Sequence, residues 1–157
     1  MTPEEALLHE GLNLPAPPEP MGVYEPAVRA GDLLFLCGHV ASPQDPRWVG
    51  RVGDGVEVET AQKAADYVAR QTLATVKMAV GSLDHVERPV KVTGFVSCTP
   101  DFTDVPAVIN GFSKVMTKVF GAAGRCARSA VGVASLPAGV CVEVESVFLL
   151  KKDAPRR

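Results

Sequence analysis

The chain has 157 residues, with 46% hydrophobic and 22% charged side chains, as expected for one ordinary globular domain. Its 16 basic and 18 acidic residues give a net charge of −2, which excludes a strongly basic surface for nucleic acid or an anionic membrane. One Trp, two Tyr and six Phe are too few to favour a stacking platform for single-stranded nucleic acid.

The N-terminal 21 residues predict a short helix followed by a stiff tether. Thr2 is expected as the N-cap, Pro3 as the first helical residue, and Glu5 as the residue that closes a capping box. The segment LPAPPEP (14–20) ends this region because proline favours extended backbone over helix. We therefore expect an N-terminal helix and a proline-rich tether outside the main domain.

The next segment predicts a β-hairpin. Two runs of strand-forming residues, 23–30 and 33–41, are separated by the Gly-containing turn that joins them. Pro26 lies inside the first run, which favours an edge strand or a bulge there. Residues 42–56 contain two prolines and three glycines and are expected to form an irregular loop.

The remainder predicts two helices and three strands. Apolar residues recur every three to five positions over 58–83, and a second one-sided helix is expected over 105–120, ended by Gly121. Three further runs of strand-forming residues cover 90–98, 126–134 and 140–150. Helices that are apolar on one side need a sheet to cover, so the predicted class is α+β.

The four cysteines and three histidines show no metal-binding spacing. No Cys-x-x-Cys pair is present, and three cysteines lie in apolar runs, which favours buried thiols over disulfides or metal ligands. Each histidine is expected to be exposed or hydrogen-bonded rather than catalytic, and no metal is predicted. The acidic N-terminus is unlike a secretory signal and no apolar run matches a membrane span, so the expected location is the cytoplasm.

Alternation in the last strand separates an apolar face from a face that carries carboxylates. Val142 and Val144 share one face, whereas Glu143 and Glu145 point to the other together with apolar residues such as Val147. A face that mixes carboxylates with apolar side chains is expected to be partly buried against another subunit.

Arg128, on the preceding strand, shares a face with Ala130 and Gly132, whose small size leaves room beside it. Its planar guanidinium can hold a carboxylate through two hydrogen bonds. Glu143 or Glu145 can orient water or move a proton if partial burial raises its pKa. The pattern by itself also fits, and favours, an ion pair between Arg and Glu on adjacent strands, because lone Arg and Glu residues on strands are common.

A longer motif resembles that of a known family. The segment ARSAVGVASLP (127–137), followed by VEVE (142–145), resembles the RidA/YjgF signature A-R-S-x-V-x-V-x-x-L-P with V-E-x-E. Similarity outside it covers Tyr24, Gly31, Leu36-Cys37-Gly38, ARQTLATVKMAV (69–80) and DFTDVPAVINGF (101–112). It is closest to a bacterial subgroup of longer chains. The resemblance spans 22–150, leaving the N-terminal segment 1–21 and a charged tail, 151–157.

The resemblance implies a chorismate-mutase-like α+β fold, a mixed sheet backed by two helices, assembled as a homotrimer with ligand clefts between subunits. By position in the motif, Arg128 matches the arginine that grips the substrate carboxylate. Glu143 matches the glutamate that positions the hydrolytic water. Tyr24 matches a cleft tyrosine, and the backbone amides of Gly38 and Ala130 match further carboxylate contacts.

The activity that the resemblance implies is hydrolysis of reactive 2-imino acids, or their enamines, to 2-keto acids and ammonia, without a metal or organic cofactor. Because the imine carbon is already electrophilic, orientation of substrate and water supplies most of the catalysis.

Two positions depart from the family: Ala130 replaces a cleft cysteine, and Pro106 replaces an asparagine. Two alternatives remain: a trimeric binder of 2-keto acids without turnover, and an endoribonuclease or translation inhibitor, which the charge disfavours.

Overall fold

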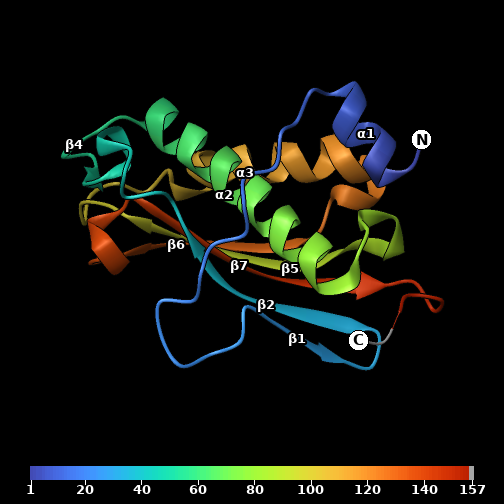
Figure 1. The fold of residues 1–157 in the computed structure, drawn as a ribbon. Helices are drawn as coiled ribbons and strands as arrows, with labels where there is room; N and C mark the ends of the chain where they lie inside the picture. Colours follow the sequence, from blue (N-terminus) through green and yellow to red (C-terminus); the bar gives the residue numbers. More distant parts are fainter. Residues whose placement is uncertain (156–157) are drawn as a thin grey trace.

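Two long helices cover one face of a five-stranded mixed sheet in the computed structural model, which describes residues 1–155 (Figure 1). Only β5 and β6 pair in parallel; the other neighbouring strands of this sheet are antiparallel. Across the sheet the order is β1 (Ala27–Ala30), β2 (Leu33–Val40), β7 (Val142–Leu150), β5 (Val86–Ser97) and β6 (Ala127–Val133). The predicted α+β class is confirmed. Residues 156–157, the end of the predicted charged tail, lie outside the described part.

The helices α2 (Val58–Val80) and α3 (Val105–Phe120) pack against each other and against the sheet. A Cβ added at Gly111 would overlap the Gln62 carbonyl, so this glycine allows the close approach of the two helices. Helix α3 has the predicted bounds and ends at Gly121, whose φ is 58°. Helix α2 ends three residues earlier than predicted because Gly81, with φ 87°, terminates it. A separate turn, η2 (Leu83–His85), follows.

The N-terminal half of the sheet differs from the prediction in two places. The first strand begins at Ala27 rather than at residue 23, so Pro26 precedes an edge strand instead of interrupting it. The predicted irregular loop, 42–56, holds a 3-10 turn, η1 (Pro46–Trp48), and two short parallel strands, β3 (Arg51–Val52) and β4 (Gly55–Val56). A valine in each of these short strands is buried in the core, and this burial orders the segment. The prolines and glycines by themselves had predicted an irregular loop.

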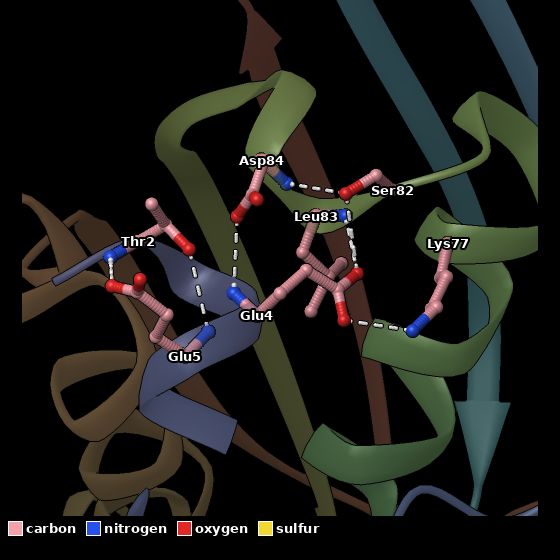
Figure 2. A network of polar contacts seen from close by, with 7 residues as sticks. All are labelled: Thr2, Glu4, Glu5, Lys77, Ser82, Leu83 and Asp84. Carbon is pink, nitrogen blue, oxygen red and sulfur yellow. Dashed lines mark hydrogen bonds and ion pairs between the residues drawn. The ribbon is translucent and has the colours of Figure 1, made fainter. Parts of the chain in front are cut away.

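Helix α1 (Pro3–His9) has the predicted capping box. The Thr2 hydroxyl accepts a hydrogen bond from the Glu5 amide at 3.3 Å, and the Glu5 carboxylate accepts one from the Thr2 amide at 2.8 Å (Figure 2). Both bonds satisfy amides that lack partners at a helix start. Across residues 1–155, none of the helices is both long and apolar enough to span a membrane.

Glu4 docks α1 against the end of α2. Its carboxylate accepts hydrogen bonds from Lys77 Nζ at 2.7 Å, the Leu83 amide at 2.9 Å and Ser82 Oγ at 3.3 Å (Figure 2). In return, the Glu4 amide donates to Asp84 Oδ1 at 3.0 Å. These reciprocal contacts fix the N-terminal helix to the domain.

Replacing Glu4 with glutamine is expected to lower the free energy of unfolding by about 1 kcal/mol, because the side chain that accepts the hydrogen bond from Lys77 is then uncharged. Partial burial raises the pKa of the Glu4 carboxyl, but hydrogen bonds from Lys77 and the Leu83 amide outweigh it and leave the pKa below its ordinary value. The stabilisation is therefore full above the ordinary pKa and is lost as pH falls through the lowered one.

Urea unfolding of both proteins at neutral and acidic pH measures this difference. Glu87→Gln is the matched control, because it removes the same charge from an exposed position on β5. Equal effects of the two substitutions would contradict a docking role for Glu4.

Candidate functional site

A cavity of about 560 Å³ lies between the N-terminal tether and the strands β2 and β7. Its volume is within the range typical of small-molecule sites. Three residues predicted from the sequence line it: Tyr24, Gly38 and Glu143. Other lining residues include Pro18, Met21, Cys37, His39, Gln71 and Pro137.

An irregularity in the sheet places Glu143 in this cavity. The register between β2 and β7 shifts between Leu36 and His39, so Cys37 and Gly38 form a bulge next to Val40, the residue that pairs with Glu143. A Cβ added at Gly38 would overlap Glu143 Oε1. The glycine therefore lets the carboxylate lie directly against the backbone of the bulge.

The surroundings of Glu143 favour the protonated form of its carboxyl group more than water does. Burial raises the pKa of the Glu143 carboxyl, and the charge of Glu145 raises it further. Burial also raises the pKa of the neighbouring Cys37 thiol, as does the Glu143 charge. Cys37 therefore remains a protonated thiol beside a carboxylate that can accept a proton.

His39 fastens the bulge to helix α2. The side chain is buried, with Nδ1 3.0 Å from the Cys37 carbonyl oxygen and Nε2 2.7 Å from Thr75 Oγ1. A carbonyl oxygen can only accept, so Nδ1 donates to it and Nε2 accepts from the Thr75 hydroxyl. Burial lowers the pKa of His39, which keeps the ring neutral. The prediction that this histidine is hydrogen-bonded is confirmed.

Arg128 lies outside this cavity, at the β6 edge of the sheet, and reaches helix α3. Its Nη1 donates to Asn110 Oδ1 at 2.9 Å and to Ser113 Oγ at 3.0 Å. Its Nη2 donates to the Pro106 carbonyl oxygen at 3.4 Å. These contacts hold the guanidinium on the helix side of the sheet, beside Ala130 on the same strand face.

The interpretation of an Arg–Glu ion pair across adjacent strands is wrong. Strand β5 lies between β6 and β7, so the strands of Arg128 and Glu143 are not neighbours. Arg128 is opposite the buried Val92, on the face that the helices cover, whereas Glu143 is opposite Phe95 on the other face. One chain therefore carries two separated halves of the predicted site.

Asn110, Ser113 and Gln71 lie around the two halves and were not predicted from the sequence, whereas Pro106 was identified there as a departure from the family. Pro106, Asn110 and Ser113 recur at i, i+4 and i+7 on α3, a spacing that could have indicated one shared helix face. Gln71 lines the cavity, and its buried Oε1 has no hydrogen-bond partner among residues 1–155. Nothing local in the sequence marks Gln71, because its position under the cavity depends on how α2 packs.

The prediction that the cysteines are free thiols can be compared with the structure. All four cysteines are free, Cys98 and Cys141 fully buried and Cys37 and Cys126 partly so. Within residues 1–155, no cluster of three or more His, Cys, Asp or Glu side chains could hold a metal ion.

The chain is similar to a family model, to known sequences and to solved structures over most of its length. A family model described as "Endoribonuclease L-PSP" matches residues 15–149. Protein TCP17 of Trypanosoma cruzi is 38% identical over 142 residues, 89% of each chain. The 2-iminobutanoate/2-iminopropanoate deaminase of Salmonella typhimurium is 32% identical over 131 residues, covering 83% of this chain and 89% of the relative. An Agrobacterium tumefaciens protein of unknown function has a crystal structure with TM-score 0.84 and 36% identity, covering 95% of this chain and 92% of that one.

Proposed function

The chain belongs to the RidA/YjgF family, whose family model is described as "Endoribonuclease L-PSP", and from this we propose that it hydrolyses reactive 2-imino acids or their enamines to 2-keto acids and ammonia. The observation that carries the proposal is the Glu143 carboxylate, whose pKa is raised, in a cavity of small-molecule size. Such imines arise from pyridoxal-phosphate enzymes, and four free cysteines fit the reducing cytoplasm as the location.

In the proposed reaction, Arg128 and the Gly38 amide hold the substrate carboxylate, and Glu143 orients a water molecule toward the imine carbon. Water adds to the C=N bond while one of its protons passes to Glu143. That proton is then delivered to nitrogen, which gives a carbinolamine. Glu143 takes the proton of the new hydroxyl group and passes it to the amino nitrogen, so the C–N bond breaks and ammonia leaves as the C=O bond of the 2-keto acid forms. No external oxidant or reductant is needed.

We further propose that the complete site lies between the subunits of a homotrimer. Arg128 and Glu143 face opposite sides of the sheet, so a neighbour's β6 edge has to supply the arginine to the Glu143 cavity. The helix-free face also exposes apolar side chains that another copy would bury: Val28 at 53%, Phe35 at 45% and Val131 at 43% exposure. Light scattering at several concentrations should give a mass of three chains.

The direct test is to generate 2-iminobutanoate or 2-iminopropanoate in situ and compare its decay with and without the protein. We expect faster decay, with stoichiometric 2-keto acid and ammonia. Unchanged decay across several amino-acid-derived imines would sink the proposal.

Gly38→Ala is expected to lower the rate of imine hydrolysis by about 10²-fold, because the added methyl group displaces the Glu143 carboxylate. The displaced atoms end a flexible side chain, so the thermal unfolding temperature should change little. Gly31→Ala, at a turn outside the cavity where a φ of 63° strains alanine, is the control for a loss of stability that leaves the cavity unchanged. Wild-type activity in Gly38→Ala would show that the carboxylate does not act at this bulge.

A second candidate function is binding of small carboxylates without turnover. Ala130 and Pro106 stand where family members usually have a cysteine and an asparagine, and both lie beside Arg128. Calorimetric binding of 2-keto acids that is lost in Arg128→Ala, with no imine hydrolysis, would favour it. Endoribonuclease activity is disfavoured by the net charge of −2. RNA cleavage that persisted in an Arg128→Ala, Glu143→Ala double variant would indicate contamination.

A further inference from the structure

The N-terminal tether runs between two ordered elements, helix α1 and strand β1. Helix α1 is docked by Glu4 (Figure 2), and Leu12 and Leu14 then pack against the core. At the other end, the Met21 amide donates to Tyr24 Oη at 3.0 Å just before β1 begins. Figure 1 shows this segment running from α1 past the helices to the β1 and β2 side of the sheet. The tether is therefore a positioned wall rather than a loose spacer.

The tether presents an apolar wall to the cavity. Pro18, Pro20 and Met21 of the tether line the cavity, and Pro26, just before β1, adds a third proline. Prolines have few conformations to lose when a ligand binds, so they make a rigid apolar surface at low entropic cost. Val40, Ala41 and Pro43 line the cavity from beyond the bulge, so apolar groups also face it from β2 and the following loop.

The charges in the same cavity are acidic. Glu19 and Glu143 line it, and its one histidine, His39, is buried and held neutral. No Lys or Arg is among the lining residues described for this chain. A substrate side chain that carries a carboxylate would meet repulsion here, with no cation on the tether to offset it.

We propose that tether residues 18–21 form the side-chain subsite of the active site and select 2-imino acids with uncharged, apolar side chains larger than methyl. This inference rests on the proposed function, because the substrate carboxylate has to be held at the Gly38 and Arg128 end. The side chain then lies against Met21 and the prolines, and each methylene buried there strengthens binding about fourfold.

Calorimetry with 2-keto acids, the stable products, tests the subsite without any turnover. The full-length protein is titrated with pyruvate, 4-methyl-2-oxopentanoate and 2-oxoglutarate at one pH and salt concentration. We expect 4-methyl-2-oxopentanoate, which has three more carbons than pyruvate, to bind about 60-fold more tightly, and 2-oxoglutarate to bind no better than pyruvate. Equal affinity for the three acids, or a preference for 2-oxoglutarate, would overturn the proposal.

Met21→Ala should weaken binding of 4-methyl-2-oxopentanoate severalfold and leave pyruvate unchanged. Met78→Ala is the matched control, because Met78 is a partly exposed methionine on α2 outside this cavity (48% exposed, against 66% for Met21). Met21→Lys should improve binding of 2-oxoglutarate by supplying a cation. Equal losses for pyruvate and the larger acid in Met21→Ala, or no gain in Met21→Lys, would count against the subsite.

The two proposals fail in different ways. Selective keto-acid binding without imine hydrolysis would leave the subsite in place and remove the deaminase activity. Imine hydrolysis with equal rates for small, apolar and acidic side chains would support the deaminase activity and rule out the subsite. If none of the 2-keto acids binds, both the carboxylate site and the subsite are overturned.

Discussion

Glu143→Gln is expected to lower kcat for imine hydrolysis by about 10²- to 10⁴-fold, the usual contribution of a general base. Glutamine keeps the size of the side chain beside the Gly38 bulge but cannot accept the proton from water. Binding of 2-keto acids should be nearly unchanged, because Arg128 and backbone amides hold the carboxylate. Steady-state rates and calorimetry on the same preparations separate the two effects.

The pH dependence provides the control. Burial, then the Glu145 charge, raises the pKa of Glu143, so kcat/KM should fall as pH drops through that raised pKa and protonates the base. Glu145→Gln removes the second cause and should move this acid limb to lower pH while activity at higher pH persists. An unmoved limb in Glu145→Gln, or full activity in Glu143→Gln, would exclude Glu143 as the base.

Arg128→Ala is expected to raise KM, and to weaken 2-keto acid binding, by about 10²-fold, the scale of a lost buried charge pair. The hydrogen bonds from Arg128 to Asn110, Ser113 and Pro106 hold the guanidinium in one orientation, so Arg128→Lys should rescue little. Arg125→Ala, just after the 3-10 turn η3 (Gly121–Gly124), removes a positive charge without touching this network and is the matched control.

Mixed oligomers decide whether the site is shared between subunits. Arg128→Ala and Glu143→Gln chains, each nearly inactive alone, should regain activity when refolded together. If each cleft takes Arg128 from one chain and Glu143 from the next, an equal mixture of trimers has both native residues in about a quarter of its clefts. No recovery in mixtures that form trimers would mean that both residues act from the same chain.

Local interactions allowed much of the fold to be predicted. The capping box at Thr2 and Glu5 involves residues three apart, and helix α3 follows from a one-sided apolar pattern ended by Gly121. Alternation in β7 likewise predicted that Glu143 and Val144 face opposite sides. The first strand was predicted four residues too early, because the turn formed by Met21 and Tyr24 depends on the fold around it.

The sequence by itself determined the family, the α+β class and the faces of individual strands, because motif spacing and side-chain periodicity are local properties. Only the tertiary structure decided which strands are neighbours, since pairing joins segments far apart in the chain. The insertion of β5 between β6 and β7 separates Arg128 from Glu143 and replaces the expected ion pair with two half-sites. The same long-range packing brings the tether, which was expected outside the main domain, to the wall of the Glu143 cavity.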